Sequence, residues 1–436
     1  MSVKKANLNY LYPFSISNWP SMKAETDKQW TPASSKEFRK HISGTMLDFM
    51  GVTSDQTTDA KWHGYCYTRS LAESMSQLNN KEIHLAVGKK TCNSQAKVKF
   101  RDKLWLFLSA DHKVGILQVS LAIDNPCKLE DVYIFNNVFH KLEESQVATL
   151  MTQTRKKNEL NPTNEAEAMN SSSAEGRSLE LEMSPIKEAE TMNVVLQKLL
   201  PQLGNNLTPL GHRFIIAAHV ALENEDLNSL DVKKGLIYLA KGQNGQYQLT
   251  TKDMGTINEM FSNVLVCAHY EGFAACNLLD GSEYQKQFST QTFPQAYLPS
   301  FIVSLLTEKM MSAAFSGIPK NSMDTSSLKT MRNLKLLSSI PMSEHSHINR
   351  AYAICREALG IPDKNEGLTE YLMAAEQQRE VRSDYSLNIM MAVLALSQTI
   401  FSMLGNDICG AWRIGIGAIT LIFAFVLLVI NKRNKK

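Results

Sequence analysis

Two stretches without a charged residue lie near the C-terminus, and they limit what this chain can fold into more than any other feature. Residues 387–404 and 414–430 carry only uncharged side chains, and the second stretch is apolar almost throughout. A helix of about 18 residues extends over roughly 27 Å, close to the apolar thickness of a bilayer. The sequence therefore predicts a hairpin of two transmembrane helices connected by residues 405–413. For the more polar first stretch, a buried helix of a soluble domain is the alternative.

Basic residues are distributed unevenly around these two stretches. A basic cluster at 432–436 follows the second stretch, Arg379 and Arg382 precede the first, and the connector holds only Arg413. Positively charged flanks tend to stay on the cytoplasmic side of a membrane. We therefore expect a multi-pass protein in the lipid bilayer of the cell inner membrane, with both termini in the cytoplasm.

The first uncharged stretch carries small and polar residues at helical spacing. They form one stripe, with steps of four and three residues: Asn388, Ala392, Ala395, Thr399, Ser402 and Asn406. Polar groups in lipid are costly unless they face water or protein. The stripe therefore either lines an aqueous path between several copies or lets helices pack closely. In the first case Gly405, Asn406 and Asp407 form the outer mouth of the path.

Residues 366–385 have the pattern of a helix that continues into the first uncharged stretch. Leu368, Leu372 and Ala375 repeat at steps of four and three. This spacing suits a stalk that packs against copies of itself, and it equally suits an ordinary amphipathic helix. The unbroken pattern from 366 to 404 predicts one rod of roughly 58 Å.

The rest of the chain has the pattern of a mixed α/β body. Alternating apolar residues at 97–109 and 114–123 predict a strand hairpin. Further strands are expected at 213–221, 235–240, 247–250, 263–269 and 273–278. Helices are expected at 129–149, 295–316, 326–338 and 348–359.

The expected fold class is an α/β cytoplasmic domain, a mixed sheet with flanking helices, joined by a long stalk helix to two C-terminal transmembrane helices. Its expected parts are a first α/β part (1–153), a flexible polar linker (154–185), a second α/β part (186–285), a helical part with the stalk (286–386), and the transmembrane hairpin with its basic tail (387–436). The linker is assigned because residues 154–185 are polar and contain no aromatic residue.

Composition and motifs argue against several functions. The 46 basic residues nearly balance the 43 acidic ones, so no basic footprint for nucleic acid is expected. The seven cysteines are widely spaced and predict neither a disulfide framework nor a zinc site. No phosphate loop, HExxH or GxSxG motif occurs. We therefore expect no catalytic residue, no bound metal, no cofactor and no enzyme.

Two pairs of residues remain as candidates for contact with a ligand. His212 and Arg213 precede an apolar run and offer donors to a phosphate, although such residues also simply cap strands. His345 and His347 lie two residues apart without a nearby cysteine, so they are either a metal pair or solvated loop histidines.

Residues 366–436 follow a recognisable order: a long helix, a first membrane helix, a short outer loop, a second apolar helix and a terminal lysine cluster. In this order the chain resembles the CorA family of magnesium channels. The resemblance implies a pentameric homo-oligomer and an ion channel, with Mg²⁺ as a candidate transported ion. The family carries Gly-Met-Asn at the end of its first membrane helix. Here the matching place reads Gly405-Asn406-Asp407, so the glycine matches and the methionine does not.

The altered motif makes the chain more similar to a divergent CorA-like branch that accompanies type III CRISPR systems. This resemblance implies a membrane effector of antiviral defence. It also implies that a small nucleotide, S-adenosylmethionine joined to AMP (SAM-AMP), opens the channel. Two alternatives stay open: a constitutive magnesium transporter, and a membrane-anchored binding module that does not conduct ions.

Overall fold

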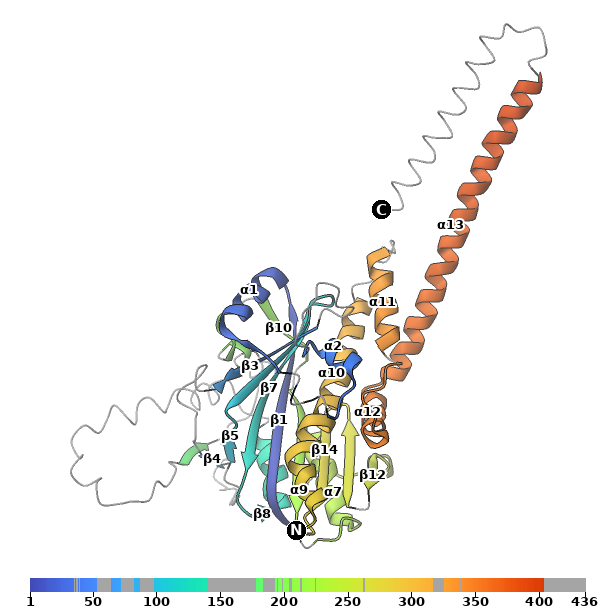
Figure 1. The fold of residues 1–436 in the computed structure, drawn as a ribbon. Coiled ribbons are helices and arrows are strands. Elements are labelled where there is room, and N and C mark those ends of the chain that lie inside the picture. The colour runs from blue at the N-terminus through green and yellow to red at the C-terminus, as the bar shows by residue number, and fades with distance from the viewer. Residues whose placement is uncertain are drawn as a thin grey trace, which may run out of the picture. The chain divides into compact units, whose positions relative to one another are not determined.

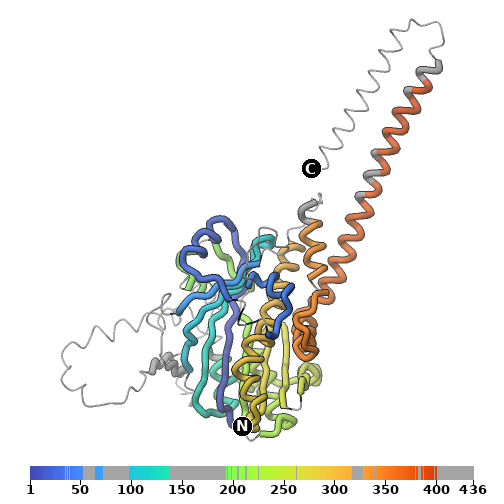
Figure 2. Tube along the Cα trace, viewed as in Figure 1, coloured from blue at the N-terminus to red at the C-terminus, as the bar shows by residue number. Residues whose placement is uncertain are grey.

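The protein was analysed as a computed structural model. The structure describes residues 1–52, 64–71, 82–86, 98–139, 178–182, 193–316 and 325–403, apart from one or two consecutive positions at several places within these ranges. Figure 2 traces the chain. The chain divides into two compact units. Unit 1 consists of Met1–Ala313 and Ile340–Pro362, and unit 2 of Ala314–Ser339 and Asp363–Lys436.

A mixed sheet forms the centre of unit 1. Its strands are β1 (Ser2–Ile16), β2 (Thr31–Pro32), β3 (Gly64–Ser70), β4 (Glu82–Ala86), β5 (Val98–Phe100), β6 (Lys103–Ser109), β7 (Val114–Ile123), β8 (Cys127–Lys128), β9 (Ser178–Glu182), β10 (Leu207–Pro209), β11 (Ile215–Leu222), β12 (Ile257–Phe261), β13 (Val264–His269) and β14 (Gly272–Leu278). The main path through the sheet runs β12-β13-β14-β11-β1-β7-β5-β4-β9, and β6 continues from β7 to β3. Among the described pairs, β11 with β14 and β4 with β9 are parallel.

The long first strand organises this sheet. β1 pairs antiparallel with β11 on one side and with β7 on the other. Its even-numbered residues from Ala6 to Ile16 are apolar and buried in one cluster. Alternate residues of a strand point to the same face of a sheet, so these side chains form a full row on one face. Residues from the N-terminus therefore lie at the middle of the core.

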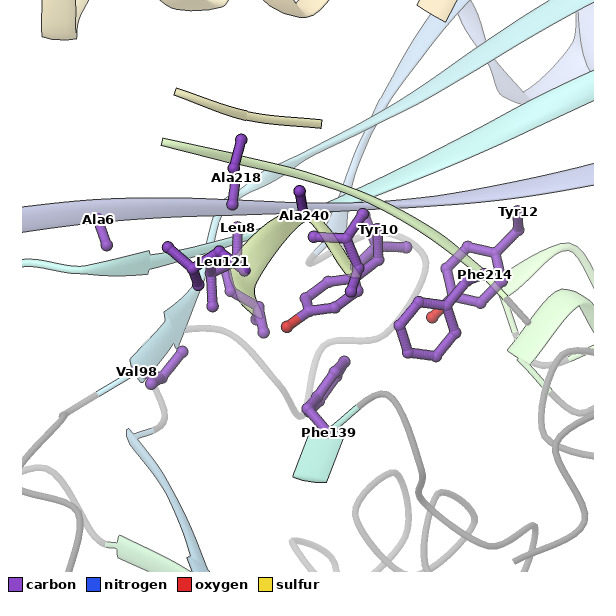
Figure 3. Close-up of a cluster of buried hydrophobic side chains, with 14 of the residues drawn as sticks. Ala6, Leu8, Tyr10, Tyr12, Val98, Leu121, Phe139, Phe214, Ala218 and Ala240 are labelled. Atoms are coloured by element: carbon purple, nitrogen blue, oxygen red, sulfur yellow. The ribbon is translucent and has the colours of Figure 1, made fainter. Parts of the chain in front are cut away.

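Two helices, α4 and α7, cover that face of the sheet. The helices of unit 1 are α1 (Trp19–Gln29), α2 (Gly44–Met50), α4 (Leu129–Phe139), α7 (Leu230–Lys241), α8 (Thr251–Met254), α9 (Glu283–Gln287), the π-helix η4 (Phe288–Tyr297), α10 (Leu298–Ser316) and α12 (Ser346–Ala358). Contacts join α4 to β1 and α7 to β11, β13 and β14. The close-up in Figure 3 shows side chains of this core, where Tyr10 lies between Leu121, Phe139 and Phe214.

The opposite face of the sheet packs against η4 and α10. Phe273 on β14 stacks against Phe293 of η4 and Phe301 of α10. Its neighbour Ala274 lies in the core on the other face. Figure 1 shows α10 running alongside the strands of this region. A sheet covered on both faces explains why β11 and β14 are almost continuously buried.

Unit 2 contains α11 (Thr325–Leu337) and α13 (Ile361–Met403), which begins at the last residues of unit 1. An ion pair joins Arg332 of α11 to Glu376 of α13. The buried residues of α13 lie near its start, at Leu368, Leu372 and Ala375. The expected continuity of the rod is confirmed, because α13 is one helix of 43 residues.

The prediction of two C-terminal transmembrane helices is wrong for this structure. Among the described residues, no helix combines the length and apolar character needed to cross a membrane. Residues 387–403 form the end of α13, where polar Asn388, Gln398 and Thr399 interrupt the apolar side chains. The second expected span, 414–430, lies outside the described residues. The other half of the expected fold class, a mixed sheet with flanking helices, is confirmed.

Several predicted elements can be compared with the structure directly. The hairpin of β6 and β7 and the buried helix α10 are confirmed. Residues 235–240 were expected as a strand and instead lie in helix α7. Residues 247–250 form no strand. Within the expected linker 154–185, residues 178–182 form β9, and the other residues lie outside the described part of the chain.

Candidate functional site

A tight loop holds the start of α12 in a fixed shape. The side chain of Asn349 accepts a hydrogen bond from Ser343 N at 3.0 Å and donates one to Ser343 O at 2.6 Å. The backbone N–H of His345 donates to Ser343 Oγ at 3.2 Å. These bonds close the loop on itself and present His345 and His347 side by side, with ring centroids 5.7 Å apart.

A third histidine joins this pair from a distant part of the sequence. The His41 ring lies 6.4 Å from the His345 ring, and Ser43 N donates to Met342 O at 2.9 Å, which ties the two loops together. Burial lowers the pKa of His41, and nearby His345 and Lys40 lower it further. Burial likewise lowers the pKa of His347, with His345 and His41 adding to the effect. At neutral pH both imidazoles are therefore uncharged, and each can donate one N–H group.

Aromatic rings continue from the histidines across neighbouring elements. The His347 ring lies 4.9 Å from Phe261 of β12 and 6.2 Å from Tyr297 of η4. Phe261 in turn meets Tyr284 of α9 at 5.6 Å, and Tyr284 is 42% exposed. Burial and Tyr284 raise the pKa of Tyr297, whereas the nearby Arg350 opposes the rise. This group is called the histidine–aromatic cluster below: His41, Phe261, Tyr284, Tyr297, His345, His347 and Arg350.

The cluster surrounds a helix end that no side chain caps. His345 is the N-cap residue of α12, and it makes no side-chain capping bond. The first N–H groups of a helix have no partner within the helix and carry partial positive charge. The cluster can therefore donate several hydrogen bonds to an anion and stack on a planar ring. No group of three metal-binding side chains was found in the described part of the chain.

A second group of polar side chains lies buried beneath η4. His219 Nε2 is 2.8 Å from Asn277 Oδ1, which also accepts from Ser289 Oγ at 3.1 Å. The amide nitrogen of Asn277 donates to Gln285 O and Oε1 at 3.1 and 3.0 Å. Because Asn277 Oδ1 can only accept, His219 carries its proton on Nε2. Burial lowers the pKa of His219 to about 4, so it is neutral in the folded protein.

Aromatic contacts connect this buried network to the surface cluster. Phe288 lies 5.7 Å from the His219 ring and 5.2 Å from Tyr297, which belongs to the histidine–aromatic cluster. Both Phe288 and Tyr297 are fully buried. The π-helix η4 supplies both rings, and π-helical segments occur often at functional sites. Phe288 therefore lies between the two groups and contacts a ring of each.

A third arrangement looks like a catalytic pair but lacks the required proton geometry. Thr256 Oγ1 is 3.0 Å from His269 Nε2 and 3.3 Å from Cys267 Sγ. However, the Thr256 hydroxyl donates to Asp253 O at 2.6 Å, so His269 must donate to it and cannot remove its proton. Burial raises the pKa of Cys267 to about 12, which keeps the thiol protonated. These contacts connect Thr256, directly before β12, to Cys267 and His269 of β13.

The residues proposed from the sequence fall into three groups in the structure. His345 and His347 lie in the cluster. Asn388, Ala392, Ala395 and Thr399 are exposed on α13, and the hydroxyl of Thr399 donates to Ala395 O at 2.8 Å. The remaining candidates lie outside the residues, or the side chains, that the structure describes: His212, Arg213, Ser402, Gly405, Asn406 and Asp407.

Sequence reasoning missed most of the histidine–aromatic cluster. His41 and Phe261 stand far from His347 in the chain, and no local spacing relates them. The one local signal is the Ser-Glu-His-Ser-His run before a helical pattern, for which the sequence leaves open a metal pair or solvated loop histidines. No family model and no curated protein matches this chain.

Proposed function

We propose that the protein is a ligand-controlled effector, in which a ligand bound by unit 1 at α12 changes the state of α13. The observation that carries this proposal is the short connection between the two helices. α12 begins at the histidine–aromatic cluster and ends at Ala358, and α13 begins at Ile361. Only Leu359 and Gly360 lie between them, and Gly360 adopts φ +65°.

The C-terminal part of α13 has a surface suited to contact with another molecule. Its large apolar side chains are between 38% and 68% exposed: Val381, Tyr385, Leu387, Ile389, Met391, Leu394 and Leu396. Large apolar side chains that are exposed in such number on one segment indicate contact with protein or lipid. We propose that α13 meets copies of itself in a homo-oligomer, and that ligand binding shifts the balance between its arrangements. A ligand can do so only by binding one arrangement more tightly than the other.

The ligand that we propose is a small nucleotide, SAM-AMP, as the CorA-like resemblance of the sequence implies. A nucleotide combines an anionic phosphate with a planar base, and the histidine–aromatic cluster offers donors and rings for both. The output that we propose is ion flux across a membrane in type III CRISPR defence. That output rests on the resemblance of the sequence alone.

Ion flux from protein-loaded liposomes tests this proposal. We expect flux after addition of SAM-AMP, and no flux with S-adenosylmethionine and AMP added as separate molecules. Magnesium flux without any nucleotide would contradict ligand control and favour a constitutive transporter. Absence of flux under every condition, despite measured SAM-AMP binding, would contradict the channel output and favour a binding module that does not conduct ions.

A further inference from the structure

The start of α12 has the polarity of an anion site. Ser346 and His347 are the first residues of this helix, and no side chain caps it. Exposed basic side chains flank the helix end, with Lys40 in the opposing loop and Arg350 one turn along α12. Glu344 is the single acidic residue in the 340–350 segment. An anion here would gain both from the helix end and from the cations.

Unsatisfied polar atoms around the helix end point to a missing partner. The side chain of Tyr297 is fully buried and stacks against His347, and no described group bonds its hydroxyl. His41 Nε2 is also buried without a partner among the described groups. Buried polar atoms are nearly always satisfied by protein, water or a ligand. Two such atoms beside an uncapped helix end are therefore an independent sign of a bound group.

Aromatic rings also adjoin His347. Phe261 packs edge-on to His347 and to Tyr284, and Tyr284 remains partly exposed. A planar heterocycle placed on Tyr284 would gain stacking energy without depending on a particular hydrogen-bond pattern. His347 therefore adjoins both the hydrogen-bond donor His345 and the aromatic ring of Phe261.

We infer that His41, His345, His347 and Arg350 form a phosphate subsite at the start of α12, with Phe261 and Tyr284 as the adjoining base subsite. The ligand class is a nucleoside phosphate. This assignment deepens the proposed function, which it presupposes only for its link to α13, because the binding itself is tested separately. The phosphate of a lipid headgroup has the same chemistry, and the experiment below separates the two sources.

Calorimetric titration of the full chain with AMP, adenosine and inorganic phosphate tests the assignment. We expect AMP to bind more tightly than either of its parts, because it fills both subsites. Vesicles with an anionic phospholipid should bind less tightly than AMP and should not compete with it. Equal competition by such vesicles would overturn the nucleotide as the source of the phosphate.

Two exposed side chains allow the subsites to be separated without disturbing the core. Arg350→Gln should weaken both AMP and inorganic phosphate by roughly tenfold or more, since hydrogen bonds to charged groups are strong. Tyr284→Leu should weaken AMP by roughly tenfold and leave inorganic phosphate unchanged. Lys128→Gln on β8, which removes an exposed charge elsewhere, should change neither.

Unchanged AMP affinity in both Arg350→Gln and Tyr284→Leu, with native far-UV circular dichroism, would overturn the inference. Such a result would leave the proposed function standing if SAM-AMP still caused flux. Conversely, the expected affinity losses without any SAM-AMP response would support the site and contradict the proposed function. The two failures are therefore distinguishable.

Discussion

Replacing Lys241 with methionine is expected to lower the free energy of unfolding by roughly 3 kcal/mol or more. Lys241 Nζ lies 2.5 Å from Asp253 Oδ1, and their side chains are only 13% and 8% exposed. Burial alone would raise the pKa of Asp253, but hydrogen bonds from Lys241 and Thr250 hold it well below its usual range. Without Lys241, an ionised carboxylate would stay buried with its main counter-charge removed.

Urea unfolding of matched variants measures this effect. Lys28→Met breaks an exposed pair with Glu25, whose members are 67% and 36% exposed, and should cost less than about 1 kcal/mol. Adding Asp253→Asn to Lys241→Met should recover part of the loss, because the amide carries no charge and still reaches Thr250. Equal losses in Lys28→Met and Lys241→Met would contradict this account of the buried pair.

Replacing His219 with glutamine is expected to reduce the loss of stability in acid by about 3 kcal/mol. Burial lowers the pKa of His219 from 6.5 to about 4 in the folded protein. A proton therefore binds the unfolded chain more tightly than the folded one. The stability that neutral His219 contributes is complete above pH 6.5 and is lost as the pH falls towards 4. Glutamine does not titrate in this range and can still donate to Asn277.

The test is the free energy of unfolding of both proteins between pH 7.5 and pH 4.5, roughly the range in which this histidine titrates when unfolded. Burial also lowers the pKa of His112 to about 4, so His219→Gln should retain part of the acid sensitivity. The double variant with His112→Gln should lose more of it. Parallel curves for the wild type and His219→Gln would show that His219 is not the group responsible.

The parts of the fold that were predicted correctly are those with strong local patterns. The β6–β7 hairpin alternates clearly, and α10 and α12 have helical spacing over more than three turns. The 43-residue helix α13 has no internal breaker after Gly367. These patterns can be read within one window of sequence, so tertiary contacts were not needed to find them.

The errors arose where distant contacts decide the structure. Gly235 suggested a strand next to a turn, yet α7 has clear ends, with an N-cap at Ser229 and a left-handed Gly242. A Cβ at position 235 would lie 2.5 Å from Leu129 of α4, so the glycine permits close packing of these two helices. The central strand β1 is absent from the predicted elements, although its even-numbered residues from Ala6 to Ile16 are all apolar.

The candidate site was only partly visible in the sequence. His345 and His347 attracted notice as a pair, but their partners come from the loop at His41 and from Phe261 on β12. Tertiary contacts such as the hydrogen bond from Ser43 N to Met342 O bring these segments together, and a single sequence carries no record of them. The absence of a side-chain cap at the start of α12 depends on the conformation of His345, which the sequence does not show.

The central claim is that ligand bound at α12 changes the state of α13, and amide hydrogen exchange tests it most directly. We predict that SAM-AMP slows exchange in the first turn of α12 and also changes exchange within residues 381–399 of α13, whereas Arg350→Gln removes both effects. Helix α7, which lies on the other face of the sheet, should serve as the unchanged reference. Protection confined to α12, with the amides of 381–399 exchanging as before, would contradict the claim.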